Sequence, residues 1–327
     1  MHPGIFTISL DFELHWGVFD KRDREQRKAC YLNTRKLVPQ LLEKFSQHHV
    51  GVTWATVGSL FASDEKEWKH NWPSHLPRYA NKKYSPFIFA ETQGVGREVE
   101  WAHFAPELVQ MIPQYEQQEL ATHSFSHYYC QEAGQDINDF KADLASVQKL
   151  ALEKTGQKLS SLVFPRNQYN KEYLKACYEA GITAIRSNPN AWYWSGIGND
   201  DTSLLRKFFR TGDVFVPMGS RTSYRLDSLK VANELPINLP ASRLLRQYDS
   251  SNKTLNKIRL KRILSEMSYA AKNNECYHLW WHPENFGNNP KECMEELDLI
   301  IQQYQQLKSK NGMESWTMRK YADVLMS

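Results

Sequence analysis

Short hydrophobic runs alternate with longer amphipathic stretches along almost the whole chain. The runs contain mostly apolar residues and end at glycine, proline, asparagine or charged residues, as buried strands do. This alternation of strand-like and helix-like segments is typical of a parallel sheet or barrel with helices outside it. The pattern predicts strands at 5–10, 51–57, 119–121, 161–164, 182–185, 214–218, 231–238 and 275–281.

The amphipathic stretches carry apolar residues every three or four positions, which is the spacing of one helix face. Leu37, Leu41 and Phe45 show this spacing, as do Phe140 and Leu144. We find neither an internal repeat nor a linker, so residues 1–327 are predicted to form a single α/β domain. Helices are predicted at 106–115, 138–154, 171–180, 257–272 and 291–307.

Both patterns are lost between about residues 61 and 100. This segment is rich in Trp, Pro, Lys, His and Tyr, as Trp68, Trp72 and Tyr84 illustrate. We interpret it as a loop-rich insertion, because a connection of this length in a compact domain usually forms a lid or an oligomer contact. The sequence does not choose between the two, so a homo-oligomer stays open.

The composition indicates a folded protein without a nucleic-acid-binding face. Charged residues make up 24% of the 327 residues, hydrophobic ones 41% and aromatic ones 13%. The net charge of +4 is mild and the basic residues are mostly scattered, so no nucleic acid partner is expected. An anionic small molecule, such as a nucleotide-linked or lipid-phosphate-linked sugar, stays compatible with this charge.

The N-terminus and the cysteines favour the cytoplasm. The first residues lead directly into a strand without a basic leader or a cleavage site, and no stretch is apolar enough to span a membrane. The five cysteines show no CxxC spacing, which argues against a disulfide framework. We therefore expect cytoplasmic placement, unless a leader has been removed.

Polar clusters follow the predicted strands. Parallel α/β barrels place their active sites at the carboxyl ends of the strands, where loops from distant segments meet. Segments far apart in the sequence are therefore expected to converge on one site. The residues concerned are Asp11, Glu13, His123, His127, Arg166 and His282.

Two histidines four residues apart predict a metal site. If the backbone of 123–127 is helical, His123 and His127 lie on one face and reach the same point. Zinc prefers imidazole and carboxylate ligands, and Asp11 and Glu13 point to the same side of a strand because they are two residues apart. Ser124 occupies the place of the glutamate of a zinc protease motif, so that class is disfavoured. This leaves Glu13 as the third ligand and Asp11 as the base.

Two further side chains complete the predicted chemistry. Arg166 follows the fourth predicted strand and is expected to pair with Asp11, holding it ionised. His282 follows the last predicted strand, and because histidine as a residue type can donate a proton near neutral pH, it is a candidate general acid for a departing amine.

These segments resemble the motifs of the polysaccharide deacetylases, carbohydrate esterase family four. SLDFEL, THSFSH, FPRNQ and HLWWHPE are similar to its first, second, third and fifth motifs. The resemblance implies a distorted (β/α) barrel of parallel strands with outer helices. It also implies Glu13, His123 and His127 as metal ligands, with Asp11, Arg166 and His282 as catalytic residues.

The sequence departs from the family pattern at two motifs. Phe12 separates the two carboxylates that are usually adjacent, so Asp11 and Glu13 could exchange their roles. The fourth motif, an acidic residue that supports the catalytic histidine, has no clear match. Asp200, Asp213 and Glu284 are the candidates for it.

The resemblance implies a metal-dependent hydrolase that removes an N-acyl group, N-acetyl first, from an amino sugar during surface polysaccharide biosynthesis. Zinc is the expected metal, with another divalent transition metal as the alternative. A hydrolase of linear or cyclic non-sugar amides and a non-catalytic carbohydrate-binding protein stay open. The expected substrate-binding residues are Trp16, Asn167, Tyr169 and Trp281, with Trp192, Trp194 and Trp280 as further stacking candidates.

Overall fold

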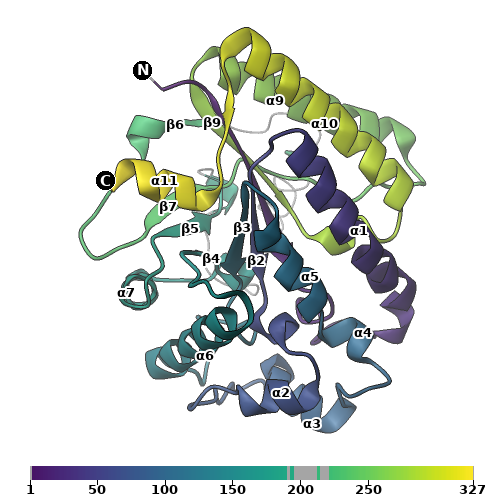
Figure 1. Cartoon of the computed structure of the whole chain (residues 1–327), viewed down its shortest axis with the longest axis vertical. Helices are drawn as coiled ribbons and strands as arrows, with labels where there is room; N and C mark the ends of the chain where they lie inside the picture. Colours follow the sequence, from purple (N-terminus) through teal and green to yellow (C-terminus); the bar gives the residue numbers. More distant parts are fainter. Residues whose placement is uncertain (1, 190–191, 195–211, 214–220, 327) are drawn as a thin grey trace.

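A curled, mostly parallel sheet forms the centre of the molecule (Figure 1). The computed structural model describes residues 2–189, 192–194, 212–213 and 221–326. The strand order is β6 (Tyr224–Arg225), β9 (Glu275–Trp281), β1 (Ile5–Phe12), β2 (Val52–Thr56), β3 (Gln118–Thr122), β4 (Ser161–Val163), β5 (Ala184–Ser187) and β7 (Ile237–Pro240). Two short strands extend this sheet: β10 (Glu314–Ser315) pairs with β1, and β8 (Arg243–Leu244) pairs with β9. Among the described strands only β6 is antiparallel to its neighbour, β9.

Helices surround this sheet, and the predicted barrel-type α/β domain is confirmed (Figure 1). The longer helices are α1 (Lys28–Gln47), α6 (Ile137–Thr155), α7 (Lys171–Glu179), α9 (Lys253–Lys272), α10 (Pro290–Asn311) and α11 (Met318–Leu325). Short helices are α2 (Glu65–His70), α3 (Pro86–Gln93), α4 (Glu100–His103) and α5 (Pro106–Met111). Single 3-10 turns are η1 (Glu25–Arg27), η2 (Gly58–Phe61), η3 (Lys82–Tyr84), η4 (Ile112–Gln114), η5 (Pro165–Asn167), η6 (Trp192–Trp194), η7 (Leu226–Ser228) and η8 (Pro283–Asn285).

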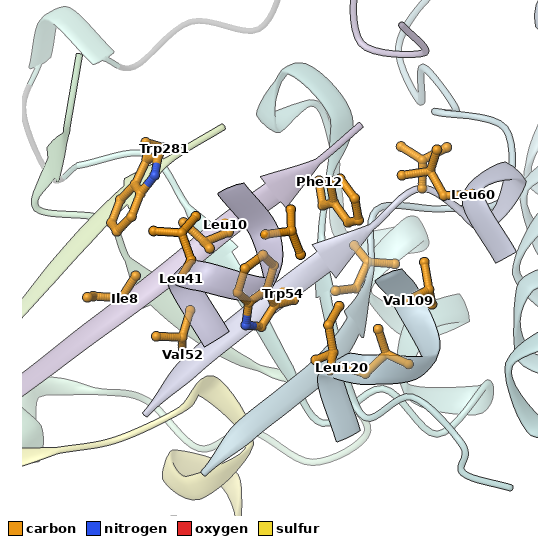
Figure 2. Packing of buried hydrophobic residues seen from close by; sticks show 14 of the residues in the cluster. Ile8, Leu10, Phe12, Leu41, Val52, Trp54, Leu60, Val109, Leu120 and Trp281 are labelled. Carbon is orange, nitrogen blue, oxygen red and sulfur yellow. The ribbon is translucent and has the colours of Figure 1, made fainter. Parts of the chain in front are cut away.

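The central strands are buried on both faces, which explains their continuous hydrophobic character. All of β1 is buried, and Leu10 and Phe12 pack near Trp54 of β2 and Leu41 of α1 (Figure 2). The rings of Phe12 and Trp54 meet edge to face with their centroids 6.3 Å apart. Full burial of each such side chain contributes about 1.5–3 kcal/mol, so this core fixes the positions of the strand ends.

Three expectations about the elements need correction or qualification. The strand predicted at 231–238 starts only at Ile237, because Pro236 and the turn before it interrupt the ladder. The strand predicted at 214–218 lies outside the described residues. The insertion at 61–100 contains short helices, and Trp68 of α2 packs into the main core against Trp16 and Phe87.

None of the helices in the described part of the chain is both long and apolar enough to cross a membrane.

Candidate metal centre and active site

Polar side chains from several strands meet at the carboxyl edge of the sheet. Asp11 lies in β1, and Glu13 is the first residue after that strand. His123 directly follows β3 and His282 directly follows β9. Arg186 lies within β5. All five line one cavity of about 400 Å³. The predicted convergence of distant segments is therefore present in the structure.

Glu13 and two histidines form a group that could hold a divalent metal. Glu13 Oε1 lies 2.9 Å from His123 Nε2 and 3.2 Å from His127 Nε2. All three side chains are buried, and their ligand atoms lie within 4.8 Å of one another. Two imidazole nitrogens and one carboxylate oxygen form a ligand set that leaves a coordination position for water or substrate.

The hydrogen bonds behind the histidines favour a cation at this point. His123 Nδ1 lies 2.8 Å from the carbonyl oxygen of Val163, and that oxygen can only accept, so Nδ1 carries the proton. The lone pair of a neutral His123 therefore faces the carboxylate of Glu13. Two lone pairs at this distance repel unless a positive charge lies between them, so these residues fit a bound metal. His127 Nδ1 likewise has an outer partner, the Tyr129 hydroxyl at 3.2 Å.

The protonation of the group also suits metal binding. Burial by itself would raise the pKa of Glu13, but His282 and His127, with hydrogen bonds from His123 and His127, hold that pKa well below its usual value. Burial lowers the pKa of His127, against the opposing effect of Glu13. An ionised carboxylate and a neutral imidazole are the forms that bind metals.

The turn that carries the two histidines is not helical, which corrects the sequence-based expectation. Ser124 and His127 have φ values of 62° and 56°, so the chain turns through left-handed conformations that aim both imidazoles inward. Asp143 of α6 holds this turn by accepting hydrogen bonds from Phe125 N, at 2.6 Å, and from the backbone N and hydroxyl of Ser126. The local i, i+4 geometry comes from these contacts and not from a helix face.

Asp143 gives the protein a pH-dependent stability. Burial raises the pKa of Asp143 to about 7, although the hydrogen bonds from Ser126 and Phe125 lower it. The pKa of Asp143 in the folded protein lies above its value of about 3.9 in the unfolded chain, so protonation of this carboxyl stabilises the folded state. This contribution is complete below pH 4 and is lost as the pH rises toward 7. The difference in unfolding free energy between wild type and Asp143→Asn should fall by about 2 kcal/mol from pH 5 to pH 7.

Denaturant unfolding of both proteins at several pH values measures this difference. The comparison removes the contribution of other titrating groups, because the variant retains them. A difference that stays constant from pH 5 to pH 7 would show that Asp143 is ionised throughout this range.

Asp11 is paired with Arg186, so the expected pairing with Arg166 is wrong. The two guanidinium nitrogens of Arg186 each lie 2.7 Å from one carboxylate oxygen of Asp11, and Ser9 Oγ accepts a further bond at 3.0 Å. Both charged side chains are almost completely buried. This bidentate contact fixes the orientation of the Asp11 carboxyl group.

Arg166 instead binds carboxylates beside the centre. It donates to Asp20 at 2.7 Å and to Glu132 at 3.1 Å, and its guanidinium lies 3.8 Å from the ring centroid of Tyr129. The reason is local, since Arg166 has a φ of 54° in the tight turn after β4. It still lines the cavity. The sequence signal for Arg186 was a charged residue inside the apolar strand Ala184–Ser187.

His282 lies at the mouth of the centre, within reach of both carboxylates. Its Nε2 is 3.7 Å from Glu13 Oε1 and 3.9 Å from Asp11 Oδ2, and 31% of its side chain is exposed. The ring of Trp280 lies beside it, with centroids 5.7 Å apart, and also covers the guanidinium of Arg186. A partly open histidine in this position can exchange a proton with a ligand in the cavity.

The Glu284 side chain contacts the backbone around Glu13. Its Oε1 accepts hydrogen bonds from the backbone N–H groups of Glu13, at 3.1 Å, and Leu14. Burial, followed by the nearby charge of Glu13, raises the pKa of Glu284 to about 8. Two other residues were candidates for the fourth motif. Asp213 pairs with Arg243 of β8 and with Arg262 of α9. Asp200 lies outside the described residues.

Two of the expected sugar-stacking residues are wrong. Trp16 and Trp281 are fully buried in the core and do not line the cavity, so they have no free face for a sugar ring. Tyr169 stacks on Phe164 and also lies outside the lining, whereas Asn167 lines the cavity.

Trp280 is the indole that borders the site. Trp194 lies with Trp280 on a small neighbouring cavity, and the side chain of Trp192 lies outside the described residues. A hydrophobic strand end does not by itself distinguish an indole in the core from one at the surface.

The family model for polysaccharide deacetylases matches residues 19–185, slightly more than half of the chain. The matched segment contains His123, His127 and Arg166, whereas Asp11, Glu13 and the segment around His282 lie outside it. No curated protein sequence matches the chain.

Solved structures share the fold at low sequence identity. A presumed polysaccharide deacetylase from Mycobacterium smegmatis has a TM-score of 0.61 at 13% identity, covering 99% of this chain and 91% of that one. A probable polysaccharide deacetylase from Pseudomonas aeruginosa PAO1 has a TM-score of 0.58 at 10% identity, covering 98% and 89%. Puue allantoinase has a TM-score of 0.56 at 8% identity, covering 98% and 89%.

Proposed function

The chain belongs to the polysaccharide deacetylase family, and from this premise we propose that it is a metal-dependent hydrolase that removes an N-acyl group from an amino sugar. Family membership supports a deacetylase activity in general. The observation that carries the finer proposal is the convergence of Glu13, His123 and His127 with Asp11 and His282 on one cavity.

The metal ligands are Glu13, His123 and His127. A zinc ion bound by them would supply a Lewis acid that polarises the acyl carbonyl and lowers the pKa of a water molecule. The outer partners of the two histidines, the Val163 carbonyl and the Tyr129 hydroxyl, hold the imidazoles in the orientation that this requires.

Asp11 is the proposed general base. Its carboxylate is fixed by Arg186 and faces the same cavity as Glu13, so it is placed to accept the proton of the attacking water. As the oxygen of that water bonds to the acyl carbon, the bond between this carbon and the sugar nitrogen has to break. The products are a carboxylic acid and the free amino sugar.

His282 is the proposed general acid. The leaving amine needs a proton, and His282 Nε2 lies 3.7 Å and 3.9 Å from the two carboxylates while staying partly open to the cavity. The backbone N–H groups of Asn167 and Gln168, in the turn after β4, already donate to carbonyls of that turn, so they are not free to stabilise an oxyanion. The chain itself therefore contributes mainly the base, the acid and the metal ligands.

The biological setting is also part of the proposal. The enzyme would act on sugar units for surface polysaccharides in the cytoplasm. The support for a reducing compartment is that the five cysteines are all free and buried.

An assay with defined substrates tests the proposed function. Metal-depleted protein reloaded with Zn²⁺, Co²⁺ or Mn²⁺ should release carboxylate from N-acetylated or N-formylated amino sugars. His282→Gln should lower this rate by a factor of about 10²–10⁴ and retain the metal, because His282 is proposed as acid and not as ligand. Asp227→Asn, which removes an exposed carboxylate, is the control.

Allantoin and linear amides belong in the same panel. Hydrolysis of allantoin in place of the N-acyl sugars would replace the proposal with a ureide hydrolase. Tight sugar binding without turnover in metal-loaded protein would instead indicate a binding protein.

A further inference from the structure

The cavity that contains the metal ligands has a basic rim. Besides Arg166 and Arg186, the segment after β1 contributes Lys21, Arg22 and Arg27 to its lining. A neutral sugar polymer needs no such concentration of positive charge. The rim therefore bears on the chemical class of the substrate.

The charges of this rim differ in whether they are already neutralised. Arg186 is paired with Asp11, and Arg166 is paired with Asp20, which also lies 3.9 Å from the ammonium of Lys21. Within the described ranges, Arg22 and Arg27 form no ion pair with an Asp or Glu. These two guanidinium groups are the unneutralised positive charges of the rim.

Arg27 is held in place at the rim. Its Nε donates to the Tyr31 hydroxyl at 3.0 Å, and the guanidinium lies 5.3 Å from the ring centroid of Tyr31. Its side chain is only partly buried, so it keeps donor capacity for a ligand in the cavity. A guanidinium ordered by a neutral partner is a suitable site for an anion, because little side-chain entropy is lost on binding.

Arg22 continues the positive region into a second cavity. Arg22 lines both the cavity of the metal ligands and an adjacent cavity of about 500 Å³. Lys82 and Lys83 line only the adjacent cavity. Three acidic residues also border this second cavity, and two of them are paired with basic side chains. Asp20 pairs with Arg166, Asp23 accepts from the backbone of Gln26, and Glu25 pairs with Lys28.

We infer that the substrate is an N-acyl amino sugar carrying a phosphate or diphosphate group, with the anion bound between Arg22 and Arg27. This inference rests on the proposed function, since the acyl group has to reach the metal ligands. Guanidinium groups bind phosphate through paired, charge-assisted hydrogen bonds. The second cavity provides room for the group on the far side of the phosphate, either a nucleoside or a lipid.

Rates with matched substrates test the inference. The charged probes are N-acetylglucosamine 1-phosphate, UDP-N-acetylglucosamine and a short-chain prenyl diphosphate of the same sugar. The neutral probe is methyl N-acetylglucosaminide. We expect kcat/KM for the best charged probe to exceed that for the neutral one by about 100-fold, which is about 10-fold for each of two charge-assisted contacts.

Charge-removing variants give the second part of the test. Arg22→Gln and Arg27→Gln should each raise KM for the charged probe by about 10-fold, and this loss should be several times larger than any loss on the neutral probe. Lys36→Gln removes an equal charge from an exposed position of α1 and lines neither cavity, so it is the control. Calorimetry of metal-depleted protein with pyrophosphate should show binding that both arginine variants weaken and the control does not.

The outcomes separate the inference from the function on which it rests. Equal or faster turnover of the neutral probe overturns the anionic substrate and leaves the deacetylase intact. The absence of turnover with every N-acyl sugar overturns the proposed function. A preference for the nucleotide probe or the prenyl probe identifies the source of the phosphate.

Discussion

Replacing His127 by alanine should abolish metal binding and hydrolysis together. His127 Nε2 is one of three ligand atoms around a single point, and its removal leaves Glu13 and His123, too few to retain zinc. If the metal supplies about 4 kcal/mol of transition-state stabilisation, its loss should lower kcat/KM about 1,000-fold. Metal content by mass spectrometry and the rate on an N-acyl sugar measure the two effects.

The control is His75→Ala, which removes an exposed histidine of the insertion and should change neither quantity. Circular dichroism of the His127 variant checks that the fold persists. A variant that loses its metal but keeps the wild-type rate would remove the metal from the mechanism. One that retains both would remove His127 from the ligand set.

Replacing Arg186 by methionine should be strongly destabilising. The change leaves Asp11 buried and charged without its guanidinium partner, which typically costs about 3–5 kcal/mol. The double variant Asp11→Asn with Arg186→Met removes both charges, so it should recover at least half of this loss. Denaturant unfolding of wild type, both single variants and the double variant measures the coupling between the two residues.

Activity should respond differently from stability in this set. The double variant should stay inactive, because Asp11 is the proposed base and the amide that replaces its carboxylate cannot take up the proton of the water. An Arg186→Met protein as stable as wild type would show that Asp11 is protonated or solvated in the folded state. An active double variant would transfer the role of base to another residue, with Glu13 the first alternative.

The fold was predictable because its strands are buried on both faces. Their hydrophobic runs end at polar residues, and in a parallel sheet these ends share one edge. Residues adjacent to a strand end, such as Glu13, His123 and His282, were therefore found from the sequence. Strand 275–281 was predicted with the bounds it has in the structure.

The errors concern relations that local sequence does not encode. The partner of Asp11 is Arg186, 175 positions away, and no spacing rule relates the two. The turn at 123–127 depends on Asp143, which anchors it from α6. The indoles of Trp16 and Trp281 are in the core because of how distant elements pack, and a count of tryptophans gives no information on this.

The contact between Glu284 and the backbone of Glu13 joins residues 271 positions apart. Glu13, His123 and His127 are synthesised well before His282 and Glu284, which lie 155 and 157 positions after His127. A nascent chain that ends between these segments therefore contains the proposed metal ligands but neither the proposed general acid nor the side chain that accepts from the backbone of Glu13. We therefore expect hydrolytic activity only after β9 has been synthesised and has paired with β1.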